Sequence, residues 1–153
     1  MTFHIHSLVP EFWCSDFEES LQFYTNVLGF SVTQRRGNDR HAYLELGDAQ
    51  LMIAHWEQDG TWDPAPFEKP YGRGVNIFIL VEDIRALYER ILTAGHTPFV
   101  ELHTTSYWRT DRMDERTEFG LLDPDGYLLR FSQVDSYSSI EQRDLDELDQ
   151  KNF

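Results

Sequence analysis

The chain has 153 residues, of which 41% are hydrophobic and 14% aromatic, enough to bury one core but too few for two ordinary domains. It carries 13 Lys and Arg residues against 27 Asp and Glu residues, so its formal net charge is −14. This charge repels nucleic-acid phosphates and anionic membranes, so neither is expected as a partner. A cationic partner and a well-solvated surface without a charged partner both remain open.

No segment of the chain predicts export or membrane insertion. Cys14 is the single cysteine, so it cannot form an intramolecular disulfide, and the first residues lack the pattern of a signal peptide. The longest strongly apolar stretch, residues 75–81, is far shorter than the roughly 18 residues of a membrane span. The sequence therefore predicts a cytoplasmic protein, with Cys14 as a buried and unreactive thiol.

The first half of the chain alternates between strand and helix patterns. Residues 9–13 predict a strand, and Ser15 and Asp16 follow it as helix-capping residues. Apolar side chains then recur at helical spacing until Gly29, which suits the left-handed conformation that ends a helix. Further strands are expected directly after residue 30, at residues 41–46 and at residues 50–56.

The second half begins after a change of composition. Residues 59–74 are rich in proline, glycine and charge and predict an exposed connector. A strand at residues 75–81 follows, and then a helix that Asp83 caps and Gly95 closes. An exposed loop is expected at residues 104–116 and a turn at residues 123–126. The remaining strands are predicted at residues 97–102, 118–122 and 127–133.

The two halves repeat one β-α-β-β-β module. Asp16 and Asp83 are 67 residues apart, and Gly29 and Gly95 are 66 apart, so the caps and ends of the helices recur in step. The sequence predicts an α+β fold in which two tandem β-α-β-β-β modules form a curved mixed sheet with a concave pocket. Module one covers about residues 7–58, the connector 59–74 and module two 75–133, all within one domain of residues 1–135. The acidic tail, residues 136–153, is expected to be a short packed helix or a frayed end without a function.

Three stretches resemble the vicinal-oxygen-chelate superfamily, which joins glyoxalase I, extradiol dioxygenases and bleomycin-resistance proteins. They are residues 15–24 (SDFEESLQFY), 27–30 (VLGF) and 123–127 (DPDGY). Residues 8–11 (LVPE), 70–76 (PYGRGVN) and 127–131 (YLLRF) look most like the bleomycin-resistance branch. The resemblance covers residues 8–133 and implies a homodimer whose ligand lies in crevices between the subunits.

Enzymes of this superfamily hold a divalent metal with side chains from the first and last strands of each module. The matching positions in this chain are Val9, Met52, Asn76 and Arg130, none of them a usual ligand. We therefore expect no metal, no cofactor and no catalytic residue. A register one residue away would bring Glu11 or His55 closer to the site, so an enzyme with relocated ligands remains an alternative.

Apolar and aromatic side chains dominate the strand positions that the resemblance assigns to the concave face. We expect Arg130 to pair with Glu11 there, because an unpaired buried guanidinium is costly. Aromatic rings flanked by acids suit a planar cationic ligand. The predicted ligand-binding residues are Glu11, Trp13, Met52, Trp56, Trp62, Asn76, Phe78, Tyr107, Trp108 and Arg130.

These features predict a homodimeric binding protein that sequesters a bleomycin-like or other cationic aromatic compound without turnover. Two alternatives remain open. The same fold could bind a different, unidentified metabolite, since fold and site are separable. The protein could also be a metal-dependent enzyme of the glyoxalase or dioxygenase type.

Overall fold

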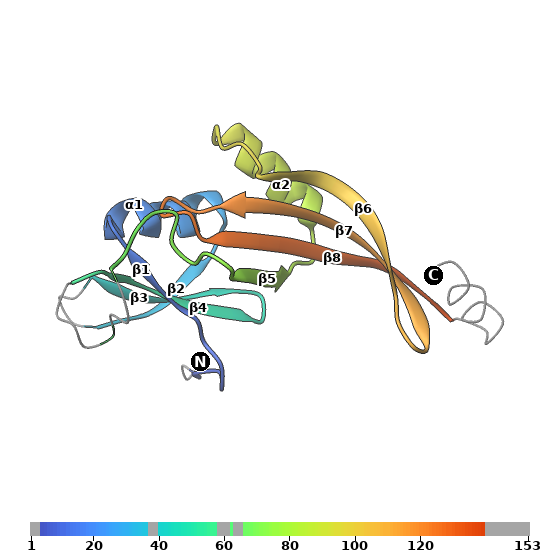
Figure 1. The fold of residues 1–153 in the computed structure, drawn as a ribbon, viewed down its shortest axis with the longest axis horizontal. Helices are drawn as coiled ribbons and strands as arrows, with labels where there is room; N and C mark the ends of the chain where they lie inside the picture. Colours follow the sequence, from blue (N-terminus) through green and yellow to red (C-terminus); the bar gives the residue numbers. More distant parts are fainter. Residues whose placement is uncertain (1–3, 37–39, 58–61, 63–65, 140–153) are drawn as a thin grey trace.

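The computed structural model describes residues 4–36, 40–57, 62 and 66–139. Two four-stranded sheets and two helices account for most of these residues (Figure 1). No helix in the described part of the chain is long and apolar enough to cross a membrane. The elements are β1 (Glu11–Cys14), α1 (Phe17–Gln22), η1 (Phe23–Val27), β2 (Ser31–Arg35), β3 (His41–Leu46), β4 (Ala49–His55), β5 (Asn76–Leu80), α2 (Ile84–Thr93), β6 (Val100–Trp108), β7 (Arg112–Leu122) and β8 (Leu128–Ser139).

The predicted duplication is confirmed by the order of the strands. The first sheet runs β1-β4-β3-β2 and the second runs β5-β8-β7-β6, so each strand of one module has its counterpart in the other. In both sheets the outer strand β1 or β5 pairs in parallel with the last strand of its module, and the other pairs are antiparallel. The chain therefore forms two β-α-β-β-β modules, as the α+β prediction requires.

Both predicted helix caps are confirmed. Asp16 accepts a hydrogen bond from the backbone N–H of Glu19, and Asp83 accepts one from Ala86. The first helix continues from α1 into the π-helical turn η1, where the Thr25 hydroxyl donates to the carbonyl of Leu21 at 2.7 Å. The π turn keeps the pattern of apolar side chains on the sheet side and ends the helix before Gly29.

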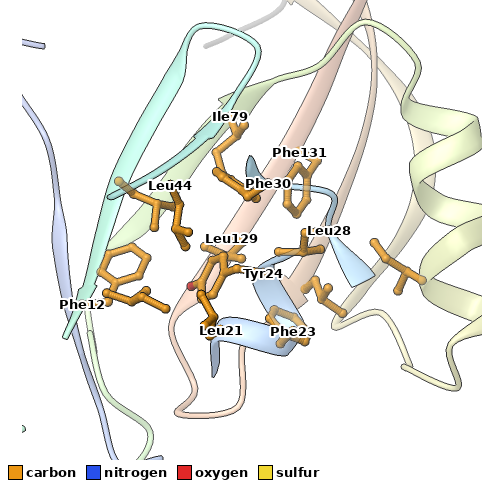
Figure 2. Close-up of a cluster of buried hydrophobic side chains, with 14 of the residues drawn as sticks. Phe12, Leu21, Phe23, Tyr24, Leu28, Phe30, Leu44, Ile79, Leu129 and Phe131 are labelled. Carbon is orange, nitrogen blue, oxygen red and sulfur yellow. The ribbon is translucent and has the colours of Figure 1, made fainter. Parts of the chain in front are cut away.

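One apolar core joins the two modules. Side chains of β1, β3 and β4 alternate between the core and the opposite face, as do those of β7 and β8. Figure 2 shows Tyr24 and Leu28 of the first module close to Leu129 and Phe131 of the second, all of them fully buried. The helices cover the core side of the sheets, with α2 packed on β7 and β8.

The turn between β7 and β8 ties the modules together through two buried carboxylates. Tyr24 donates a hydrogen bond to Asp123 at 2.9 Å, while the backbone N–H and the hydroxyl of Ser15 donate to Asp125 at 2.9 and 2.6 Å. Lys69 lies 2.8 Å from the Asp125 carboxylate. Burial raises the pKa of Asp123 to about 6, even though Tyr24 and the backbone N–H groups of Asp125 and Tyr127 hydrogen-bond to it.

The predicted loop at residues 104–116 is wrong, because these residues form most of a long β-hairpin. Strands β6 and β7 extend, together with β8, well beyond the short strand β5 and are joined by a turn at residues 109–111 (Figure 1). Thr104, Thr105, Tyr107 and Trp108 all favour strands, and charged residues occupy every second position of β7 from Arg112 to Glu118, with Glu115 as one addition between them. The charge suggested a loop, whereas its period of two is typical of a strand.

The last strand is also longer than predicted. β8 continues to Ser139, so residues 136–139 of the predicted tail are part of the second sheet and pair with the start of β7. Residues 140–153 of that tail and residues 59–61 and 63–65 of the predicted connector lie outside the described residues, as does residue 58 at the end of the predicted first module.

Candidate ligand-binding site

The second sheet has an open face, defined here as the side that carries Phe78, Tyr107, Glu118 and Arg130. Their neighbours Ile79, Phe119, Leu129 and Phe131 point the other way, into the core. Phe78 and Arg130 are directly opposite each other on β5 and β8. Side chains from all four strands therefore meet on this face.

A hydrogen-bonded network forms the centre of the open face. Arg130 donates to Glu118 Oε2 at 2.6 Å and also contacts the hydroxyl of Tyr107. Tyr107 in turn donates to the same carboxylate oxygen at 2.7 Å. The Glu118 side chain is 2% exposed, while that of Arg130 is 38% exposed. A buried carboxylate is thus paired with a cation that still reaches the surface.

The network moves the pKa of each member away from neutrality. Burial alone would raise the pKa of Glu118, but hydrogen bonds from Arg130 and Tyr107 outweigh it and hold that pKa below its usual range. Burial and the Glu118 carboxylate raise the pKa of Tyr107. The hydrogen bond to Glu118 raises the pKa of Arg130. The network therefore keeps one fixed charge pair and a neutral phenol at neutral pH.

Two arginines lie beside the same pair of aromatic rings. The guanidinium carbon of Arg130 is 5.4 Å from the centre of the Phe78 ring and 5.8 Å from that of Tyr107. For Arg116 the corresponding distances are 5.6 and 5.7 Å. Such distances allow cation–π attraction, which holds both guanidiniums against the sheet.

A cavity of about 230 Å³ opens beside this network. Polar side chains of the network line it together with apolar residues and a glycine. A cavity with apolar walls and a few fixed polar groups is typical of sites for small organic molecules. Its lining residues are Val100, His103, Thr105, Tyr107, Glu118, Phe119, Gly120, Leu128 and Arg130.

A second cavity, of about 670 Å³, lies between the modules. The turn between β3 and β4 borders it on one side, and β5 with the start of α2 borders it on the other. Three carboxylates, Asp48, Glu82 and Asp83, line it together with Arg90 and several apolar side chains. Its charge is therefore negative, unlike that of the open face.

The predicted pairing of Glu11 with Arg130 is wrong. Glu11 lies on β1 of the first sheet, where its carboxylate is 3.4 Å from His41 Nε2. Arg130 lies in the other sheet and pairs with Glu118, two strand positions from its direct neighbour Gly120 on β7. Arg130 therefore pairs with a carboxylate of the adjacent strand and not with one of the other module.

The structure brings together only some of the predicted ligand-binding residues. Asn76 and Phe78 lie at alternate positions of β5, as expected for one face, and the ring of Phe78 lies beside Arg130 of the network. Trp13 and Met52 lie with Glu11 on the first sheet. The other tryptophans are elsewhere: Trp56 packs on Phe67, Trp62 is 74% exposed, and Trp108 is 51% exposed at the end of β6.

Three residues of the site, Glu118, Arg116 and His103, were not among the predicted ligand-binding residues. Arg116 and Glu118 lie at alternate positions of β7, and His103 is opposite Glu118 on β6. The alternation of charge in residues 112–118 could have revealed the first two, because period two places them on one face. The position of His103 depends on a register shift between Val100 and His103, which no local pattern indicates.

The residues at the metal positions of the superfamily do not fit a divalent cation. Val9 has no donor, Met52 offers only a thioether, and Arg130 is a cation bonded to Glu118. Asn76 is exposed on the edge strand β5. Among the described residues, no group of three or more His, Cys, Asp and Glu side chains is arranged to hold a metal ion.

Cys14 is buried, as predicted, with 1% of its surface exposed. Burial raises the pKa of its thiol to about 12, so the thiolate is scarce at neutral pH. We expect native protein to leave the thiol reagent DTNB unreacted over minutes, and guanidinium-unfolded protein to react with one equivalent per chain. Rapid reaction of the native protein would contradict this assignment.

Comparison with known proteins agrees with this fold. Residues 4–131 match the family model of the glyoxalase/bleomycin resistance protein/dioxygenase superfamily, and the chain belongs to this superfamily. A protein of Vibrio cholerae serotype O1 named as a probable lactoylglutathione lyase is 30% identical over 122 residues, which cover 77% of this chain and 83% of that protein.

Solved structures share the fold at lower identity. A glyoxalase/bleomycin resistance protein/dioxygenase from Alicyclobacillus acidocaldarius is 22% identical with a TM-score of 0.59, covering 84% of this chain and 91% of that one. TioX from Micromonospora sp. ML1 is 21% identical with a TM-score of 0.61, covering 82% of this chain and 96% of that one. At these identities the likeness concerns the fold.

Proposed function

We propose that this protein binds a small aromatic organic molecule on the open face of the second module and does so without turnover. The observation that carries the proposal is the Glu118–Arg130–Tyr107 network beside an apolar cavity. The network fixes polar groups in place, and the cavity supplies the apolar contact area that an aromatic ligand needs.

The charges of the network favour binding over catalysis. A general acid or base works best when its pKa lies near the pH at which the enzyme operates. The pKa of Glu118 is lowered and those of Tyr107 and Arg130 are raised, so none of the three moves toward neutrality. The arginine beside the carboxylate also opposes a divalent metal at this place.

A cationic aromatic drug of the bleomycin type is a second candidate ligand. The negative cavity between the modules supports it, because Asp48, Glu82 and Asp83 outnumber Arg90 among the charged groups that line it. Phe78 borders this cavity and its ring also lies beside Arg130 on the open face, so this residue adjoins both candidate sites.

The test is a titration of metal-free protein with metal-free bleomycin and, separately, with uncharged naphthamide, followed by isothermal calorimetry. Saturation by naphthamide with one site per chain supports the proposal, and tight binding of bleomycin identifies the cationic ligand class. If neither compound binds up to about 1 mM, which corresponds to about −4 kcal/mol, and the anion naphthoate does not bind either, the proposal is wrong.

A metal-dependent enzyme is the alternative, and the name of the 30% identical relative is what favours it. Metal analysis of the purified protein and an assay of the lyase activity named for that relative, with and without added divalent metal, decide between the two. About one metal ion per chain with metal-dependent turnover would replace the binding proposal by the enzymatic one.

We also propose that the protein is a homodimer. Edge strand β5 and the residue before it expose three apolar side chains, with Val75 56%, Phe78 42% and Leu80 55% exposed. Exposed apolar side chains along an edge strand are costly in water and favour a partner surface. We expect sedimentation to give twice the mass of one chain and Leu80→Lys to shift the protein toward monomer. A monomer at all concentrations, with Leu80→Lys indistinguishable from it, would contradict the dimer.

A further inference from the structure

Charge alternates along the open face of β7. Arg112, Asp114, Arg116 and Glu118 occupy every second position of this strand, so their side chains lie on the same side of the sheet. Positive and negative groups thus follow one another from the tip of the hairpin to the Glu118–Arg130 pair. The net charge of this face therefore depends on the charged residues beside this row.

Three arginines share one carboxylate at the tip of the hairpin. Arg109 Nε and Arg112 Nε lie 3.0 and 2.8 Å from Asp114, and Arg116 Nη2 lies 3.0 Å from it. The Asp114 side chain has no exposed surface. One carboxylate cannot neutralise three guanidiniums, so this cluster carries two more positive than negative charges. In a chain with a net charge of −14, a positive cluster is opposite to the overall charge.

Arg116 connects this cluster to the cavity. Its guanidinium lies over the rings of Phe78 and Tyr107, the same rings that Arg130 contacts, and Tyr107 lines the cavity. The side chain of Arg116 is 12% exposed. Within the described residues its buried Nε has no hydrogen-bond partner. A buried donor without an acceptor is unfavourable, and an incoming acceptor would remove that cost.

We infer that the ligand of the open face is an aromatic anion, whose carboxylate binds Arg116 and the neighbouring guanidiniums while its ring enters the cavity. This inference rests on the proposed function and specifies its ligand class. Arginine binds carboxylates through two parallel N–H donors, so a planar anion matches both the charge and the geometry of the cluster. The other negative charges of the chain oppose the binding of this anion only weakly, because salt screens charges beyond about 8 Å at physiological ionic strength.

The experiment compares naphthoate with naphthamide, which have the same shape but differ in charge. Calorimetry of the metal-free protein is expected to show naphthoate binding about tenfold more tightly than naphthamide. In Arg116→Gln this preference should fall below about threefold, while the affinity for naphthamide stays within about twofold of the original. Arg85→Gln, which removes an exposed arginine of α2, is the matched control and should keep the full preference.

Each outcome has a separate meaning. Equal affinity for the two compounds overturns the anion inference and leaves the binding proposal standing. A preference for naphthylmethylamine over both compounds overturns the inference in favour of a cationic ligand. If no naphthalene compound binds, the proposed function itself fails. Circular dichroism verifies that Arg116→Gln is folded, and Arg112→Gln, which leaves Arg116 in place, provides a second variant that should weaken naphthoate alone.

Discussion

Replacing Asp123 with alanine is expected to lower the free energy of unfolding by about 3 kcal/mol at neutral pH. Asp123 accepts hydrogen bonds from the hydroxyl of Tyr24 and from the backbone N–H groups of Asp125 and Tyr127, at 2.9 to 3.0 Å. The alanine variant leaves these buried donors without an acceptor. It also removes a direct link between the modules, because Tyr24 belongs to the first and Asp123 to the second.

Urea unfolding of Asp123→Ala, Tyr24→Phe and the double variant measures this link. The two single changes should cost less together than the sum of their separate costs, by about 1 kcal/mol, because they disrupt the same hydrogen bond. Asp111→Ala, at an exposed carboxylate in the hairpin turn, is the control and should change stability by less than about 0.5 kcal/mol. A loss below about 1 kcal/mol in Asp123→Ala would show that the turn does not hold the modules together.

The stability of the protein should also depend on pH through Asp123. Its pKa of about 6 lies above the ordinary value of 3.8, so between these values the folded state binds the proton more tightly than the unfolded state does. The resulting stabilisation is full below about pH 4 and is lost as the pH rises through 6. Glu118 acts in the opposite direction, because its pKa is lowered. Comparing wild type with Asp123→Asn isolates the contribution of Asp123 to the pH dependence of stability.

We expect unfolding measurements at pH values between 4 and 7 to show that Asp123→Asn loses this contribution. The difference in stability between wild type and variant should grow by about 2 kcal/mol in favour of wild type as the pH falls through this range. A difference that is independent of pH would mean that Asp123 titrates at its ordinary value in the folded protein.

Replacing Glu118 with alanine is expected to weaken ligand binding on the open face by at least about tenfold. The substitution removes the acceptor of both Arg130 and Tyr107, so neither group is held beside the cavity. Stability should fall by about 2 kcal/mol, less than for a fully buried pair, because the Arg130 side chain is 38% exposed and water can solvate part of it.

Naphthamide titration and urea unfolding test this prediction together. Glu115→Gln changes a carboxylate on the opposite face of β7 and should leave the affinity unchanged. The double variant Glu118→Leu with Arg130→Met should recover most of the stability, because it removes both charges. It should not recover the affinity for naphthamide. Unchanged affinity in Glu118→Ala would exclude the network from the binding site.

Much of the fold followed from local patterns in the sequence. Asp16 and Asp83 indicated where the helices begin, and their spacing of 67 residues revealed the repeated module. β3 was predicted with its observed bounds, since strand-forming residues end there at a Gly-Asp turn. Each cap and turn depends on residues close together in the sequence, and the repeat is the same local pattern found twice, which is why the sequence alone revealed these features.

The site was less predictable because it depends on which strands are neighbours. Arg130 has an acid in each module that could pair with it, and only the order β8-β7 in the sheet selects Glu118 over Glu11. Tyr107 was predicted to bind the ligand, but Arg116 was not, because the segment that contains it was expected to be a loop. In residues 112–118 the period of the charge pattern predicts a strand, whereas the number of charges alone suggested a loop.

The central claim is that a small organic molecule binds the open face of the second module without a metal. Backbone amide NMR shifts of the protein, titrated with naphthoate in the presence of EDTA, test it most directly. We expect saturable shift changes concentrated in β6, β7 and β8 around Tyr107, Glu118 and Arg130. Changes confined to the first sheet, or changes that require an added divalent metal, would contradict the claim.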